Sequence, residues 1–366
     1  MPYKVLARKW RPKAFDEMVG QTHVSQTLRH ALQQNRLHHA YLFTGTCGVG
    51  KTTLARLFAK CLNCETGITD TPCRKCNTCL SIERDQHPDI FEIDAASRTK
   101  VEDTRELLSN VPYLPTQARF KIYIIDEVHM LSNHSFNALL KTLEEPPEHV
   151  KFFLATTDPE KLPITVLSRC LQFHLKNLPG TVIAPHLAYV LTEENIPFEK
   201  PALALIADAA RGSVRDALSL LDQAIAFSEN NVTENAVANL LGKLPESQLL
   251  NLIQAIIDKD ISACLSNTKQ LFEASADFAQ VLEDMIRTFH HLSLLKVDAT
   301  LDFHRQHHDT LLQLAEQVSA DDLQLLYQIS LIGNRDLSLA PDAQMGFEMI
   351  LLRLIAFTPL SDTEPR

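Results

Sequence analysis

One segment of eight residues constrains this chain more than any other. Gly45-Thr46-Cys47-Gly48-Val49-Gly50-Lys51-Thr52 has the pattern G-x-x-x-x-G-K-[ST], and it holds three of the ten glycines in the chain. Glycines at these positions let backbone amides approach phosphate oxygens, and the helix that follows adds the positive end of its dipole. Lys51 would neutralise the β- and γ-phosphates of a nucleotide, and the Thr52 hydroxyl would ligate Mg²⁺. An apolar run at 41–43 and a helical pattern at 51–62 predict the strand–loop–helix setting that this motif needs.

A second motif supplies carboxylates. The apolar run 122–125 is followed directly by Asp126 and Glu127, which places both acids at the carboxyl edge of the predicted sheet, where open α/β sheets bind ligands. Asp126 would hold Mg²⁺, and Glu127 would orient and deprotonate an attacking water. Many strands end in acids, but the pairing with a phosphate loop favours nucleotide hydrolysis.

Short apolar runs alternate with helical patterns over residues 1–178, which predicts an α/β domain with a parallel sheet covered on both faces. After residue 178 the strand pattern disappears, and we expect a small helical domain over 179–242 and a second helical domain over 243–366. The expected strands are 41–43, 90–93, 121–125 and 151–155, and the expected helices of the first two domains are 51–62, 101–110, 135–143, 182–194, 201–210, 214–226 and 234–241.

Charge is distributed unevenly between the two halves. The net charge of −10 argues against a nucleic-acid partner when taken alone. Residues 1–178 nevertheless carry 23 Lys and Arg against 19 Asp and Glu, whereas residues 179–366 carry 12 against 26. A phosphate-binding surface is therefore expected in the first half. We find neither an apolar run of about 18 residues nor an apolar N-terminal signal, so we expect a cytoplasmic protein.

Four cysteines are spaced as metal ligands. Cys64, Cys73, Cys76 and Cys79 lie in a stretch rich in turn-forming residues, and four thiolates enclose a tetrahedral Zn²⁺ with no open position. Cys61 lies three residues before Cys64 and competes with it as a ligand. We prefer Cys64, because Cys61 falls on the apolar side of the helix after the phosphate loop. A redox pair or plain buried cysteines are the alternatives. An iron–sulfur cluster is a further one, although the sequence shows no accompanying redox machinery.

These motifs together resemble the AAA+ ATPases and, within them, the gamma/tau family of bacterial DNA polymerase III clamp-loader subunits. The resemblance is dense up to about residue 242 and weaker afterwards. It implies an α/β AAA+ P-loop domain with a zinc-binding insertion at about 61–82, then a helical lid and an all-α C-terminal collar. The segments that carry it, besides the phosphate loop and the cysteines, are Arg8-Lys9-Trp10-Arg11-Pro12, Ile93-Asp94-Ala95-Ala96-Ser97-Arg98, Thr142-Leu143-Glu144-Glu145-Pro146-Pro147, Leu154-Ala155-Thr156-Thr157-Asp158-Pro159 and Ser168-Arg169-Cys170.

The resemblance assigns roles that composition and spacing do not give. It implies that Thr157 is sensor 1, that Arg169 is an arginine finger reaching the ATP of a neighbouring subunit, and that Arg215 is sensor 2 on the lid. A guanidinium suits the last two positions because it stays charged and offers forked donors to phosphate oxygens. Without the family, Arg169 and Arg215 are surface arginines like many others.

The same resemblance implies contacts to adenine and to DNA. Ala7, Arg11, Pro12 and Val19 would line the adenine pocket, the alternative being a plain N-terminal arm. Arg98, Thr99 and Lys100 would contact the DNA backbone, which gives salt-dependent affinity without sequence reading. A solvated basic turn explains these three residues equally well.

The expected function is that of an ATP-hydrolysing motor subunit of the clamp loader, which opens a sliding clamp and loads it onto primed DNA. ATP, Mg²⁺ and Zn²⁺ would be its cofactors. The implied partners are the delta and delta-prime subunits, further gamma/tau copies, the beta clamp and primer–template DNA. The rivals are a branch-migration motor, a nucleoside monophosphate kinase with a zinc-bearing lid, and a non-catalytic scaffold subunit. No polymerase active site is recognisable in the sequence.

Overall fold

The computed structural model describes residues 5–97, 110–228, 230–242, 246–273, 277–300 and 308–357. The chain divides into two compact units, Met1–Glu234 and Asn235–Arg366, and each is described by itself. The expected domain boundaries after residues 178 and 242 stay a prediction.

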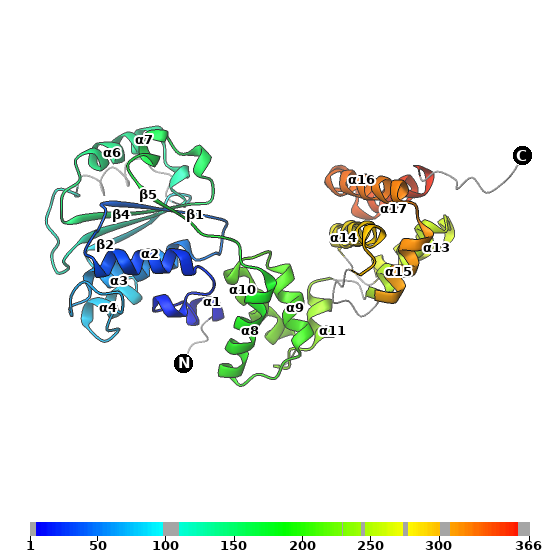
Figure 1. Ribbon diagram of the computed structural model, residues 1–366, viewed down its shortest axis with the longest axis horizontal. Coiled ribbons are helices and arrows are strands. Elements are labelled where there is room, and N and C mark those ends of the chain that lie inside the picture. The colour runs from blue at the N-terminus through cyan, green and yellow to red at the C-terminus, as the bar shows by residue number, and fades with distance from the viewer. Residues whose placement is uncertain are drawn as a thin grey trace, which may run out of the picture. The chain divides into compact units, whose positions relative to one another are not determined.

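A parallel sheet forms the centre of the first unit. Its strands are β1 (Ala40–Thr44), β2 (Ile90–Asp94), β3 (Lys121–Asp126), β4 (Val150–Thr156) and β5 (Leu171–His174), in the order β2-β3-β4-β1-β5 (Figure 1). β1, β3 and β4 are almost entirely buried, as expected for strands that are covered on both faces. The order brings the carboxyl ends of β1, β4 and β3 next to one another.

Alternate residues of these strands face two separate cores. Tyr41 and Phe43 pack with α2 (Thr22–Gln33) and α3 (Lys51–Asn63). Ala40 and Leu42 pack on the other face with α6 (Asn133–Glu144) and α7 (Ile164–Leu167). Successive side chains of a strand point to opposite faces, so the apolar runs of the sequence serve both cores, with α2 and α3 on one side of the sheet and α6 and α7 on the other (Figure 1).

Helices complete the first unit. α4 (Asn77–Glu83) packs against α3, and the short N-terminal helix α1 (Leu6–Lys9) packs against α10 (Val214–Phe227). After the sheet come α8 (Gly180–Glu194), α9 (Lys200–Ala209) and α10 (Val214–Phe227), which pack against one another. Three-residue 3₁₀ helices lie at Phe15–Glu17, Val128–Met130 and Pro159–Lys161.

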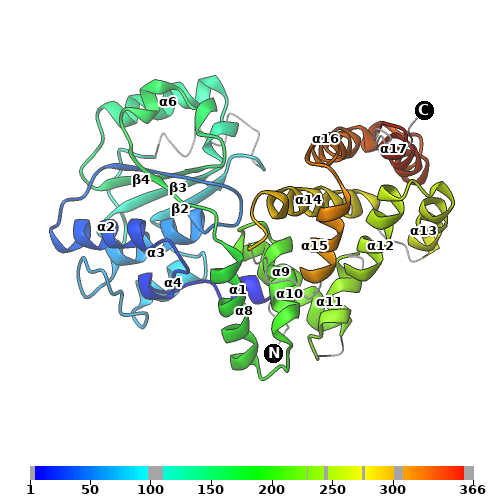
Figure 2. The same cartoon turned by 45° about the vertical axis from the view of Figure 1, so that its right-hand side comes forward.

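The second unit is helical in its described part. After α11 (Glu234–Leu240), whose first residue still belongs to the first unit, come α12 (Glu246–Ile257), α13 (Ile261–Glu273), α14 (Phe278–Val297), α15 (His308–Gln317), α16 (Ala320–Asp336), the 3₁₀ helix Leu337–Leu339 and α17 (Ala343–Phe357). α14 packs against α16 and α16 against α17, around one apolar core (Figure 2). None of the described helices combines the length and the apolar character that a bilayer crossing demands.

The fold class is the one that the sequence predicts, with differences in detail. The four expected strands are present, but β5 was not expected, because its four residues are largely exposed and polar residues alternate with Leu171 and Phe173. α2 and α4 were not expected either. The expected helix 101–110 lies outside the described residues except for Asn110, which is in a turn.

Candidate nucleotide site and four-cysteine cluster

The phosphate loop runs from the end of β1 to the start of α3. Gly45, Gly48 and Gly50 have φ values of 142°, 75° and 105°, which residues with a Cβ rarely adopt. Lys51 is only 5% exposed, and its Nζ donates to the carbonyls of Gly45 at 2.8 Å and Thr46 at 3.0 Å. The loop therefore curls around the lysine ammonium, while Cys47 is exposed and Val49 is buried.

Thr52 and Asp126 meet across the sheet edge. The Thr52 hydroxyl, in the first turn of α3, donates to Asp126 Oδ2 at 2.6 Å, and the Glu127 amide donates to Asp126 Oδ1 at 3.0 Å. Mg²⁺ in phosphate sites takes one or two carboxylate or hydroxyl oxygens together with phosphate and water. These two oxygen donors at the mouth of the phosphate loop fit that ion.

Glu127 is held by the neighbouring strand. Its backbone has a φ of 46°, which turns the side chain toward the end of β4. Glu127 Oε2 accepts hydrogen bonds from the Thr157 amide at 3.1 Å and the Thr157 hydroxyl at 2.9 Å. Glu127 Oε1 lies 3.9 Å from Lys51 Nζ. The structure thus brings Lys51, Glu127 and Thr157 together.

His129 is a neighbour of this group that sequence reasoning missed. Its Nδ1 lies 2.9 Å from the hydroxyl of the fully buried Thr156 and 3.4 Å from Glu127 Oε2. No motif that we used includes it. The only signal in the sequence was its position two residues after Glu127.

The lid contacts the phosphate loop directly. The Arg215 amide, in the first turn of α10, donates to the Gly48 carbonyl at 3.4 Å, and a Cβ on Gly48 would collide with Ser213 and Arg215. A pocket opens beside this contact, and Gly48, Gly50 and Arg215 line it together with Ala7, Trp10, Arg11, Pro12, Met18, Val19, Val49, Thr53, His186, Val214 and Leu218. Ala7, Arg11, Pro12 and Val19 therefore line one pocket, and their contact with adenine stays a prediction. His186, whose pKa is lowered by burial, was not expected there.

The N-terminal arm is fixed to the lid. The Leu6 amide donates to Asp222 Oδ2 at 2.8 Å, and Trp10 Nε1 donates to Glu194 Oε1 at 2.8 Å. The Trp10 ring also contacts Tyr189 edge-on, with the ring centroids 5.6 Å apart. These contacts join the N-terminal arm, which lines the pocket, to α8 and α10.

Arg169 lies just before β5 and is held by residues outside this pocket. Its guanidinium donates to Glu144 Oε1 at 2.9 Å and to the Thr165 carbonyl at 2.9 Å. The side chain is 33% exposed. Among the described residues, these contacts and a longer one to Ser168 are with α6, α7 and the residue directly after α7, and none of these partners lines the pocket beside the phosphate loop.

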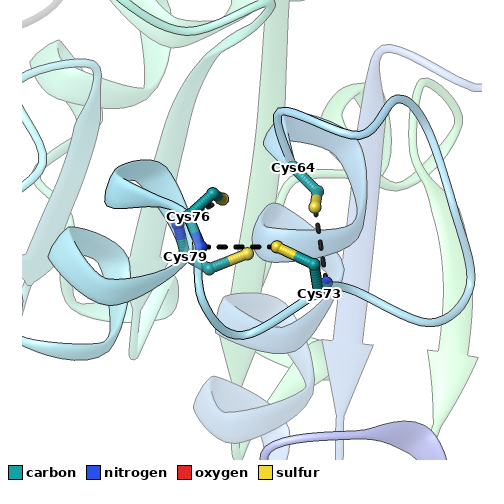
Figure 3. A group of neighbouring side chains, drawn as sticks. All are labelled: Cys64, Cys73, Cys76 and Cys79. Atoms are coloured by element: carbon teal, nitrogen blue, oxygen red, sulfur yellow. Dashed lines mark hydrogen bonds between the residues drawn. The ribbon is translucent and has the colours of Figure 1, made fainter.

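The four expected cysteines form one cluster (Figure 3). All their sulfur atoms lie within 4.8 Å of one another, close to the separations that sulfurs ligated to one tetrahedral zinc at about 2.3 Å would have. The amides of Cys73, Cys76 and Cys79 each point at the sulfur of an earlier cysteine, at 3.4, 3.4 and 3.3 Å. The donor set therefore fits Zn²⁺.

Cys61 does not belong to this cluster. It is fully buried in the core between α3 and the sheet, and burial raises the pKa of its thiol. At Cys64 burial also opposes ionisation, but hydrogen bonds from Cys73 and Thr66 lower the pKa to about 6. The sulfur atoms that lie within 4.8 Å of one another are those of Cys64, Cys73, Cys76 and Cys79, so the geometry favours Cys64 over Cys61. The expected DNA contacts Arg98, Thr99 and Lys100 lie outside the described residues.

The strand order, the phosphate loop after β1 and the helical lid define an AAA+ P-loop domain. Family models agree: one described as the delta subunit of DNA polymerase III matches residues 20–179, one for the clamp-loader ATPase lid domain matches 182–230, and one for domain III of the gamma and tau subunits matches 232–365.

Curated relatives point to the same family. The gamma subunit of DNA polymerase III from Buchnera aphidicola subsp. Baizongia pistaciae is 44% identical, and the match covers 97% of each chain. The tau/gamma subunit of Haemophilus influenzae is 54% identical over 98% of this chain and 52% of its own length, and the tau subunit of Escherichia coli is 53% identical over 98% and 56%. The chain belongs to the family of DNA polymerase III gamma and tau subunits, and it spans about half the length of the longer relatives. Among solved structures, Thermotoga maritima RuvB matches with a TM-score of 0.47 at 22% identity, over 68% of this chain and 79% of that one.

Proposed function

We propose that this chain is the ATP-hydrolysing motor subunit of a bacterial clamp loader, which opens a sliding clamp and loads it onto primed DNA as part of the DNA polymerase III holoenzyme. The observation that carries the proposal is that the phosphate-loop, magnesium-binding and water-activating residues lie together, while the guanidinium of Arg169 is held by residues outside this group. Lys51, Thr52, Asp126 and Glu127 lie together, whereas Arg169 is held by Glu144 and Thr165.

In this proposal the phosphates of ATP lie on the amides of the phosphate loop, with the Lys51 ammonium against the β- and γ-phosphates. Mg²⁺, held by Thr52 and Asp126, would neutralise charge on the phosphate oxygens. Glu127 accepts a proton from the attacking water, and the Thr157 hydroxyl fixes the orientation of that carboxylate.

Hydrolysis in this proposal is completed by a second subunit. Arg169 of one chain reaches the ATP held by its neighbour, where an arginine finger is worth about 10³- to 10⁵-fold in rate. Arg215 couples nucleotide binding to the position of the lid, because its amide donates to the carbonyl of Gly48 in the phosphate loop. We propose as partners other gamma/tau copies, the delta and delta-prime subunits, the beta clamp and primer–template DNA. Arg98, Thr99 and Lys100 would contact the DNA backbone.

The proposal is tested by measuring ATPase activity of the purified chain alone, then with the delta and delta-prime subunits, and then with clamp and primed DNA. Activity should be low for the isolated chain and rise at each addition. A branch-migration motor would respond to branched DNA instead of clamp and primer. A scaffold subunit would leave the turnover of the assembly unchanged when its own phosphate loop is disabled.

Lys51→Ala is the first variant to examine. Because the ammonium is the buried cation of the phosphate loop, its loss should reduce ATP turnover of the assembly by at least about 10²-fold. The circular dichroism spectrum and the zinc content should stay unchanged. Lys141→Ala, on α6 outside the phosphate loop, is the matched control; undiminished hydrolysis in Lys51→Ala would refute the phosphate-loop assignment.

A further inference from the structure

A second, larger cavity shares residues of the N-terminal arm with the lid pocket. Its volume is about 670 Å³, and residues of the arm, of α3 and of the four-cysteine module around α4 line it. Ligand pockets for small molecules have volumes of about 300–1,000 Å³. The proposed hydrolytic cycle assigns no role to this cavity or to the module.

Cations dominate the lining. Eight of the sixteen lining residues are Lys or Arg, and two are acidic. The arm supplies Arg8, Lys9, Arg11 and Lys13, α3 supplies Arg56 and Lys60, and the four-cysteine module and the end of α4 supply Arg74 and Arg84.

Carboxylates neutralise five of these eight cations. The pairs are Lys9–Glu194, Lys13–Glu83, Lys60–Glu83, Arg74–Glu17, and Arg56 with both Asp85 and Glu92. Arg8, Arg11 and Arg84 have neither a hydrogen bond nor an ion pair from their guanidinium groups within the described residues. Three guanidinium charges thus line the cavity without a carboxylate partner.

The surroundings of Arg11 disfavour the positive charge of its guanidinium. Burial lowers the pKa of its guanidinium, and the nearby charge of Arg56 lowers it further, against the opposite effect of Glu92 and Asp85. A partly desolvated cation beside another cation is stabilised by an anion. Guanidinium groups are the preferred partners of phosphate, because their planar donors match two phosphate oxygens at once.

We propose that this cavity binds a small anion with several phosphate groups, such as a free polyphosphate or the phosphate chain of a second nucleotide. The four-cysteine module would then have a defined task, since it holds Arg74 and Arg84 opposite the arm. Arg11 and Pro12 line both this cavity and the lid pocket, so an anion bound here would contact the same arm that borders the nucleotide.

Isothermal titration calorimetry with inorganic tripolyphosphate tests this site. The zinc-loaded full chain carries Lys51→Ala in all samples, which weakens the phosphate loop as a competing site. Arg84→Glu in this background should weaken tripolyphosphate binding at least about ten-fold, the effect of losing a charge-assisted contact. Lys75→Glu makes the same charge change in the same module, but Lys75 does not line the cavity, and its effect should stay within about two-fold.

Further measurements separate the proposal from its alternatives. Zinc removal by a chelator should abolish tripolyphosphate binding while ATP binding to the chain with an intact phosphate loop persists. The proposal is overturned if Arg84→Glu and Lys75→Glu have equal effects, or if Lys51→Ala alone removes all binding. It is also overturned if a short oligothymidylate binds in an Arg84-dependent manner and tripolyphosphate does not, because the cavity would then take a nucleic-acid backbone.

Discussion

At the scale of single residues, one oxygen of the Glu127 carboxylate contacts both Thr157 and His129. Glu127 Oε2 accepts both hydrogen bonds of Thr157 and lies within 3.4 Å of His129 Nδ1. The residue proposed to activate water is therefore oriented by the end of the neighbouring strand. A change in the position of β4 relative to β3 would move this carboxylate, which links the sheet to the rate of hydrolysis.

Thr157→Val tests this orientation. The substitution keeps the size of the side chain and the amide donor but removes the hydroxyl donor to Glu127. A hydrogen bond to a charged group contributes about 1.5–3 kcal/mol, so kcat of the assembled complex should fall about 10- to 100-fold with KM nearly unchanged.

Thr27→Val, on the exposed face of α2, is the matched control and should have no effect. A rise in KM without loss of kcat would show that Thr157 binds substrate and does not orient Glu127.

At the scale of elements, the Asp89 carboxylate holds the segment 116–118 beside the sheet by hydrogen bonds. This residue is 2% exposed and precedes β2. Its carboxylate accepts bonds from the amides of Thr116, Gln117 and Ala118 and from the Thr116 hydroxyl, at 2.7–2.8 Å. Burial opposes ionisation, but these four donors outweigh it and lower the pKa of Asp89.

Asp89→Asn should therefore destabilise the first unit by about 2 kcal/mol at neutral pH. Because the pKa is lower in the folded protein, the contribution of Asp89 is complete above the unfolded pKa of about 3.9. It is lost as the pH falls through the lower pKa of the folded protein. The difference in unfolding free energy between Asp89→Asn and the unsubstituted chain, from urea titrations, should be constant above about pH 5 and shrink below the unfolded pKa.

Glu160→Gln, in the 3₁₀ helix Pro159–Lys161 with an exposed side chain, controls for the loss of one negative charge and should change stability by less than about 0.5 kcal/mol. A pH-independent effect of Asp89→Asn would mean that the carboxylate charge is not what holds the loop.

The sequence predicted the parts of the site that are local in the chain. Short spacings in the sequence define the phosphate loop, the pair Asp126 and Glu127, and the four cysteines. Such spacings can be recognised without knowing how the rest of the chain packs. The lid pocket is different, because His186 and Leu218 reach it only through the packing of α8 and α10. β5 escaped prediction because an exposed four-residue edge strand has no apolar run. His129 depends on a contact between two strands that adjoin only in the folded sheet.

At the scale of the whole molecule, the role of Arg169 determines whether one chain alone holds every residue that hydrolysis needs. Arg169→Ala should leave nucleotide affinity of the isolated chain unchanged, because its contacts lie on Glu144, Thr165 and Ser168. DNA-stimulated hydrolysis by the assembled complex should fall about 10³-fold or more. Both quantities are measured on the same preparation, with fluorescent nucleotide titration and a phosphate-release assay.

Glu144→Gln is the matched variant for Arg169→Ala. It removes the charge of the intrachain partner but keeps the guanidinium, so stimulated hydrolysis should be largely retained. Loss of nucleotide affinity in the isolated Arg169→Ala chain would place the arginine in its own pocket and contradict the two-subunit site.

The indole that lines the lid pocket has a practical consequence. Trp10 is the single tryptophan of the chain, and it lines that pocket against Tyr189 and Glu194. Tryptophan emission from the unlabelled protein, excited selectively above the tyrosine absorption band, therefore comes from one indole at the place where adenine is expected. The kinetics of nucleotide binding can then be followed by stopped-flow fluorescence without dyes. In an assembly with several copies of this chain, one copy can be observed alone when Trp10 is replaced in the other copies.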